Sequence, residues 1–152
     1  MNKVSKLIIY SILGLLIWSC KKEKNFSTTP EIEVREFYMT SDTSAVWVIG
    51  FKDGDGDIGV KNQNETEANF PTQIYVIDQG QVVYDTAGQG YRVPVIEGVQ
   101  TENGIEGEIR LNLTGLDLFK ISGIDSLYYS GYLIDRSGKT SNVIETPIIS
   151  LN

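Results

Sequence analysis

Three aspartates alternate with glycines in residues 53–59, which read DGDGDIG. Carboxylates this close in the chain repel one another, and the glycines let the backbone curl so that all three can point inward. A hard cation that takes six to eight oxygen ligands would relieve this repulsion. We therefore predict a calcium site with Asp53, Asp55, Asp57 and the Gly59 carbonyl as ligands. The alternative is a solvated turn without a metal, because tight turns also prefer Asp and Gly.

The loop is similar to the Asp/Gly-rich calcium loops that lie between strands in extracellular β-domains. It is not an EF-hand, because Ile58 stands where that loop has glycine and Asn64 stands where it has a bidentate glutamate. The resemblance implies that Glu65 or Glu67 could serve as an outside ligand. It also implies the weak calcium affinity that is typical of extracellular modules.

Little else in the chain could perform catalysis. Histidine is absent, which removes the commonest general base and metal ligand. The acids of residues 53–59 could instead act as a glycosidase pair, which makes a calcium-dependent glycan hydrolase the alternative from another functional class. The chain has 20 Asp and Glu against 13 Lys and Arg and a net charge of −7, so we expect no nucleic-acid partner.

The beginning of the chain has the pattern of an export signal. Lys3 and Lys6 precede a run of apolar residues at 7–18, and Ser19 and Cys20 follow it. The run is shorter than the roughly 20 residues needed to cross a bilayer core, so a permanent membrane helix is the weaker interpretation. We predict a signal peptide at residues 1–19.

Residues 17–20, which read IWSC, resemble the lipobox of Gram-negative bacterial lipoproteins, and Cys20 is the only cysteine of the chain. The resemblance implies cleavage before Cys20, a diacylglyceryl thioether on its sulfur and a fatty-acylated amine. Several acyl chains would anchor the protein stably in a membrane, and we expect the outer membrane, on a side that the sequence leaves open. Residues 20–30 then form the lipidated cysteine and a flexible tether.

The remainder, residues 31–152, is predicted to be one all-β domain. Its apolar residues alternate or cluster in short runs with turn residues between them, which is typical of an antiparallel sandwich. Only residues 113–122 have a helix-like spacing, and we expect at most one helical turn there. The predicted strands are 31–39, 44–51, 73–78, 81–84, 91–96 (an edge strand that contains Pro94), 106–113, 126–134 and 142–149.

The last 45 residues resemble immunoglobulin-like and fibronectin-like modules. Asp125 and Tyr129 have the spacing of the aspartate and corner tyrosine of the penultimate strand, and residues 132–142 resemble the closing hairpin. The resemblance implies an Ig-like β-sandwich of about seven or eight strands. The paired cysteines of that family are missing, and Gly131 stands where the second would fall.

Strand alternation also predicts an aromatic face. If Tyr129 points inward, then Tyr128 and Tyr132 point outward, and Tyr75 joins them from a neighbouring strand. Such a patch binds sugars, peptides or partner proteins, although cross-strand aromatic pairs also simply stabilise sheets. We therefore predict a non-enzymatic envelope lipoprotein that acts as a binding or assembly module with a protein or glycan partner. A purely structural spacer is a further alternative.

Overall fold

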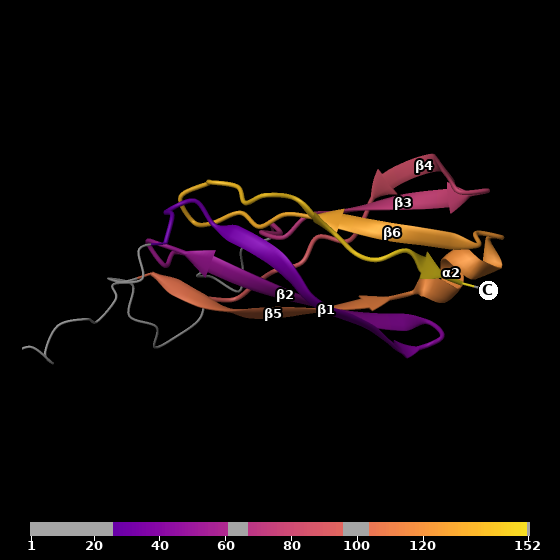
Figure 1. The fold of residues 1–152 in the computed structure, drawn as a ribbon, viewed down its shortest axis with the longest axis horizontal. Coiled ribbons are helices and arrows are strands. Elements are labelled where there is room, and N and C mark those ends of the chain that lie inside the picture. The colour runs from indigo at the N-terminus through magenta and orange to yellow at the C-terminus, as the bar shows by residue number, and fades with distance from the viewer. Residues whose placement is uncertain (1–25, 61–66, 96–103, 152) are drawn as a thin grey trace, which may run out of the picture.

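The computed structural model describes residues 26–60, 67–95 and 104–151, which form two antiparallel sheets packed face to face (Figure 1). The first sheet has the order β1-β2-β5, with β1 at Glu31–Ser41, β2 at Ser44–Asp53 and β5 at Ile105–Thr114. The second has the order β4-β3-β6-β7, and β8 also pairs with β6. Its strands are β3 at Thr72–Asp78, β4 at Gln81–Ala87, β6 at Ser126–Gly131, β7 at Ile144–Glu145 and β8 at Ile149–Ser150. The predicted all-β antiparallel sandwich is confirmed.

The core lies between the two sheets because β2 is apolar from Ala45 to Phe51 and β5 alternates. Trp47 and Phe51 of β2 are buried, and every second residue of β5 from Ile109 to Leu113 is buried with them. Trp47 meets Phe70 edge to face, with ring centroids 5.9 Å apart. Edge-to-face geometry is favoured for aromatic pairs, and these two rings pack together between the sheets.

Most predicted strands are present, but the end of the chain is less regular. The edge strand predicted at 91–96 is wrong for the described residues 91–95, which form only isolated bridges at Tyr91 and Pro94. Pro94 has no N–H to continue a ladder. The run at 126–134 ends as a strand at Gly131, and the run at 142–149 is divided into β7 and β8 around Pro147. The expected helical turn is α2, Leu116–Ile121, entered through Gly115 in the left-handed conformation.

Two of the residues that suggested an Ig-like module, Tyr129 and Gly131, lie in β6. Tyr129 is buried, its backbone N–H donates to Thr146 Oγ1 at 3.0 Å, and burial raises its pKa to about 12. Gly131 packs against Phe70, since a Cβ at Gly131 would lie 2.6 Å from the ring. The absence of a side chain at Gly131 thus lets β6 pack directly against the Phe70 ring.

The outer edge of β1 is partly closed by a side chain. The Asn142 amide accepts from the N–H of Ile32 at 2.9 Å and donates to its carbonyl at 2.8 Å. These are the two bonds that a neighbouring strand would make, so Asn142 satisfies the edge where β1 begins.

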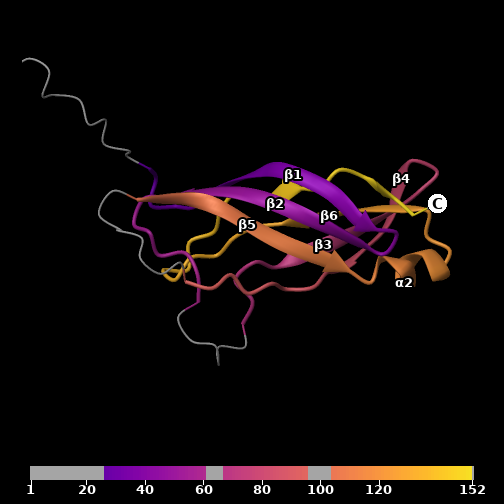
Figure 2. The ribbon, with the colours of Figure 1, turned by 90° about the horizontal axis from the view of Figure 1, so that it is seen from below.

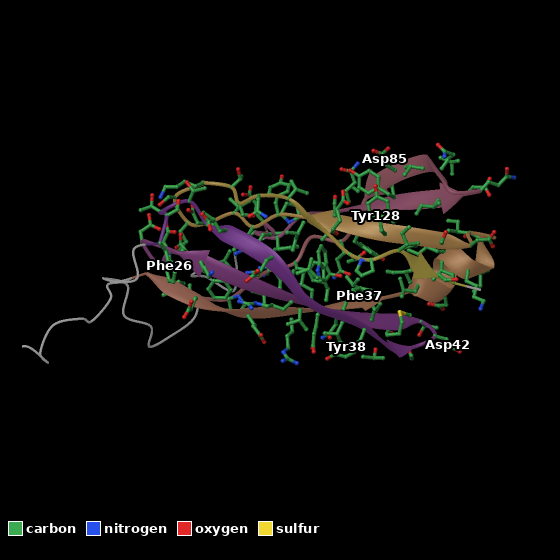
Figure 3. The ribbon with its side chains drawn as sticks, in the orientation of Figure 1. Phe26, Phe37, Tyr38, Asp42, Asp85 and Tyr128 are labelled. Carbon is green, nitrogen blue, oxygen red and sulfur yellow. The ribbon has the colours of Figure 1, made fainter. Side chains whose placement is uncertain are left out.

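The strand directions bring two acidic loops to one end of the molecule. Strands β2 and β6 run the same way, so residues 53–59 and 135–139 follow them at the same end (Figures 1 and 2). We call this end the acidic pole. Phe26 lies at the acidic pole, whereas Asp42 and α2 lie at the opposite end (Figure 3).

The predicted signal peptide and Cys20 lie outside the described residues, as do residues 21–25 of the predicted tether. Among the residues that are described, no helix has the length and apolar character needed to span a membrane.

Candidate metal centre

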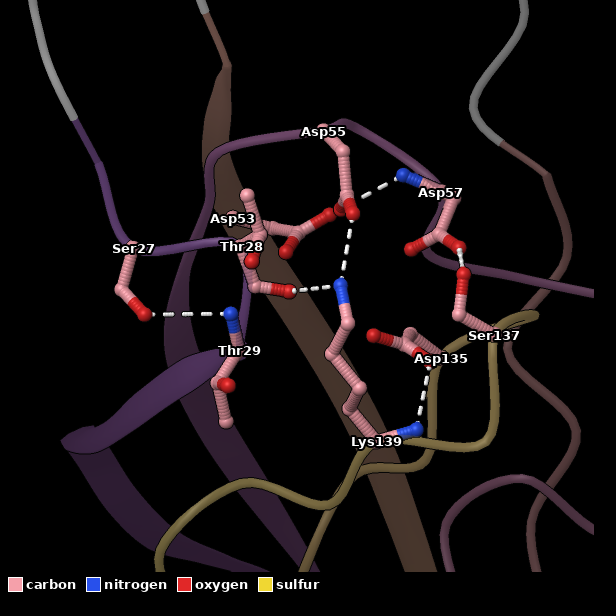
Figure 4. Close-up of polar contacts among 9 residues, drawn as sticks. All are labelled: Ser27, Thr28, Thr29, Asp53, Asp55, Asp57, Asp135, Ser137 and Lys139. Carbon is pink, nitrogen blue, oxygen red and sulfur yellow. Dashed lines mark hydrogen bonds and ion pairs between the residues drawn. The ribbon is translucent and has the colours of Figure 1, made fainter.

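Four aspartates from the two sheets meet at the acidic pole (Figure 4). Asp53, Asp55 and Asp57 come from the end of β2 and the loop after it, and Asp135 comes from the turn that follows β6. One carboxylate oxygen from each of the four lies within 4.8 Å of the other three. Oxygens this close around a common point match the ligand arrangement that a divalent cation requires.

Each of these carboxylates has one oxygen held by the protein. Asp53 Oδ2 accepts from the backbone N–H of Asp57 at 2.9 Å, and Asp57 Oδ2 accepts from the hydroxyl of Ser137. Asp55 Oδ2 accepts from Lys139 Nζ at 2.7 Å, and Asp135 Oδ1 accepts from the backbone N–H of Lys139 at 2.8 Å. These bonds fix the orientation of all four carboxylates, as outer partners do for metal ligands.

The other oxygen of each carboxylate is buried and has no hydrogen-bond partner within the described protein: Asp53 Oδ1, Asp55 Oδ1, Asp57 Oδ1 and Asp135 Oδ2. The burial is strongest at Asp53, with 0 % of its surface exposed, and at Asp135, with 6 %. A buried carboxylate oxygen without a hydrogen-bond donor or a cation lowers the stability of the fold, so native proteins rarely contain one. A bound cation would satisfy all four at once.

The electrostatics of the site indicate the same need for positive charge. Burial, together with the charges of Asp55 and Asp57, raises the pKa of Asp53 to about 6, although the hydrogen bond from the Asp57 N–H opposes the rise. The hydrogen bond from Lys139 lowers the pKa of Asp55, and the same bond raises the pKa of Lys139. Among the described side chains, Lys139 is the one that forms an ion pair with this cluster, through Asp55. The pair is partly exposed and compensates little of the repulsion.

Local backbone geometry explains how each loop forms. Gly56 and Gly59 have φ of 68° and 97°, which glycine adopts without steric cost, and they turn the chain after β2. In the other loop, the Gly138 N–H donates to the Asp135 carbonyl, and Gly138 has φ of 81°. Arg136 joins the two loops, because its Nη1 donates to the Ile58 carbonyl at 3.0 Å.

The predicted ligands are distributed as follows. The structure brings Asp53, Asp55 and Asp57 together. The carbonyl of Gly59 accepts from Arg136 Nη1 at 3.4 Å, so a guanidinium faces this fourth predicted ligand. Glu65 lies outside the described residues, and Glu67 is exposed. Sequence reasoning missed Asp135 and Lys139, although it placed both in the closing turn.

The aromatic face is present on the outer side of the second sheet. Tyr75 and Tyr128 are cross-strand partners, and their rings stack with centroids 4.7 Å apart and planes 7° apart. Tyr132 lines a surface cavity of about 400 Å³ together with Tyr75, Gln73 and Val143. The Tyr75–Tyr128 pair thus stabilises the sheet, and Tyr132 adds a ring beside a hollow that a ligand could enter.

The arrangement at the acidic pole can bind a hard cation and can cross-link the two sheets through it. The carboxylates that converge are held in place by the protein, which suits a ligand role. Comparisons of the chain with protein-family models, with curated proteins and with solved structures find no match.

Proposed function

We propose that the protein is a lipid-anchored, non-catalytic binding or assembly module of a bacterial cell envelope, with its β-sandwich stabilised by calcium at the acidic pole. The observation that carries the calcium part is the convergence of four buried carboxylate oxygens without partners, one each from Asp53, Asp55, Asp57 and Asp135. The anchor part is supported by the lipobox-like residues before Cys20. The anchor is in the outer membrane.

Calcium is the cation that fits this donor set best. It takes six to eight oxygen ligands in flexible geometry, whereas magnesium requires a near-ideal octahedron and retains several waters. Four carboxylates within 4.8 Å of one another give strong negative charge, and calcium is abundant outside the cytoplasm. Water and carbonyl oxygens would complete the coordination.

The role of the ion is to join the two sheets. Asp53 ends β2 of the first sheet, and Asp135 follows β6 of the second. Ig-like domains join the equivalent strands by a disulfide, which this chain cannot form with a single cysteine. An ion that binds Asp53 and Asp135 restrains the same two segments, and its binding free energy adds to the stability of the fold.

The binding part of the proposal concerns the outer face of the second sheet. Tyr132 and Tyr75 line the cavity of about 400 Å³ there, and Thr72 and Ser130 add hydroxyl groups. Rings beside hydroxyl and amide groups suit a protein or glycan partner. The anchor at the acidic pole leaves this face accessible from the side.

Membrane fractionation and mass spectrometry of the full chain and of Cys20→Ser test the proposal. We expect a mature chain that begins at Cys20 with three acyl chains, and release of Cys20→Ser from the membrane fraction. A chain that retains Met1 and an unmodified thiol would contradict the anchor. Hydrolysis of a glycan by the calcium-loaded protein, abolished in Asp55→Asn, would favour the calcium-dependent hydrolase instead.

A further inference from the structure

The end of the predicted tether is packed onto the metal loop. The N–H of Gly54 donates to the Ser27 carbonyl at 2.7 Å, and Lys139 Nζ donates to the Thr28 carbonyl at 2.7 Å. Pro30, where the tether meets β1, is fully buried. Residues 26–30 therefore lie against the domain, although they were predicted to belong to the flexible tether.

The packing at Gly54 is close enough to exclude any side chain. A Cβ there would lie 2.4 Å from the Phe26 carbonyl oxygen and 2.9 Å from the carbonyl atoms of Ser27. These three nearest atoms all belong to the tether, so a substitution at Gly54 acts first on docking of the tether. No positive φ is required at Gly54, so alanine fits its backbone conformation.

Both hydrogen bonds to the tether come from the two loops of the metal site, and Figure 4 shows the one from Lys139 to Thr28. Gly54 lies between Asp53 and Asp55 in the chain, so its N–H direction depends on how those two carboxylates are held. Lys139 donates to Asp55 Oδ2 and to the Thr28 carbonyl with the same ammonium group. Any change in the position of Asp55 therefore changes the contacts of the tether.

We propose that divalent-ion binding at the four aspartates and docking of residues 26–29 depend on each other, with the ion favouring the docked tether. This inference rests on the calcium site of the proposed function. Without an ion, repulsion among the carboxylates drives the loop apart and moves the Gly54 N–H away from Ser27. With an ion, the loop keeps the form in which the converging oxygens and the docked tether occur together.

The consequence is an ion-dependent spacer. Release of residues 26–29 adds four residues to the link between the lipid and the domain, and each can span at most about 3.5 Å. Ion loss therefore lengthens the link by up to about 14 Å and frees the orientation of the domain. Ion binding holds the acidic pole close to the membrane.

The test uses the lipid-anchored protein in detergent micelles with CaCl₂ as the probe. Backbone ¹⁵N relaxation of Ser27, Thr28 and Thr29 should give order parameters near about 0.85 with CaCl₂ and below about 0.6 after chelation. Because coupling is reciprocal, Gly54→Ala should weaken calcium affinity about fivefold or more. Thr29→Ala is the matched control, because the Thr29 side chain is exposed and only the backbone N–H of this residue donates, to Ser27 Oγ; this variant should bind calcium like the wild type.

The outcomes separate this inference from the proposed function. If calcium binds but the order parameters of residues 27–29 do not change, the inference is overturned, regardless of the calcium affinity of Gly54→Ala. The calcium site of the proposed function would remain supported. Equal calcium affinity of Gly54→Ala and the wild type would also overturn it. Failure of the wild type to bind calcium would refute the calcium site and the inference together.

Discussion

Replacing Asp53 by asparagine should have opposite effects in the presence and absence of calcium. Asp53 is fully buried, and burial together with its acidic neighbours raises its pKa to about 6. The charged form is therefore unfavourable in the apo protein, and a neutral amide relieves repulsion while still accepting the Asp57 N–H. In the presence of calcium, the same substitution removes a charged ligand and lowers the affinity of the site for the ion.

The size of the calcium effect follows from linkage. Extracellular calcium modules have Kd of about 10⁻⁴ to 10⁻³ M, so about 10 mM CaCl₂ is 10 to 100 times Kd. The wild type should then gain about 1.4–2.7 kcal/mol of unfolding free energy. For a domain of this length, that corresponds to a rise in Tm of about 5–11 °C. Asp53→Asn should show a rise below about 2 °C, because both charge and ligand number fall.

Differential scanning calorimetry at pH 7.5, with CaCl₂ or with a chelator, measures both effects. Asp42→Asn is the matched control, because Asp42 is exposed at the end of the molecule opposite the acidic pole. It should keep the full calcium response. The reasoning is refuted if Asp53→Asn keeps the wild-type rise in calcium, or if it lowers the apo Tm as a lost stabilising charge would.

Three further changes test the fold that positions the site. Gly131→Ala should lower the unfolding free energy in urea by about 1–3 kcal/mol, since the new Cβ would lie 2.6 Å from the Phe70 ring; unchanged stability would contradict that packing. The pKa of Tyr129 is raised to about 12 from 10.0, so the unfolded state loses its proton first and stability should fall as pH rises from 10 through 12. Tyr129→Phe should reduce that fall, and an identical alkaline profile would count against burial of the phenol. Asn142→Ala should cost about 1–2 kcal/mol and speed amide exchange at Ile32, because two hydrogen bonds to its backbone disappear; unaltered exchange would argue against that edge contact.

The fold was largely predictable because local pattern and tertiary environment agree. Strand β2 is apolar from Ala45 to Phe51 and is buried between its neighbours, and β5 alternates as a half-buried strand should. The strand predicted at 91–96 is wrong because hydrogen bonds outside the β-ladders determine the backbone conformation of residues 91–95. The Val93 N–H donates to the Asn69 side chain, and Pro94 has no N–H to offer, so residues 91–95 make bridges without a strand.

The metal site was predictable only in its local part. Asp53, Asp55 and Asp57 share one loop, so spacing alone brings them together. Asp135 lies 78 residues after Asp57 and joins them only because β2 and β6 run in the same direction in facing sheets. The resemblance of residues 132–142 to the closing hairpin of an Ig-like sandwich implies that relation, so combining it with the acidic loop could have identified this ligand.

Isothermal titration of CaCl₂ into the wild type and into Asp135→Asn tests the central claim most directly. Of the four aspartates, Asp135 is the one that follows a strand of the second sheet. Its substitution therefore distinguishes a metal site shared by the two sheets from one formed by residues 53–57 alone. We expect one saturable site in the wild type, with Kd of about 10⁻⁴ to 10⁻³ M, and at least about tenfold weaker binding in Asp135→Asn. Absence of saturable binding in the wild type, or equal affinity in the two proteins, would contradict the account.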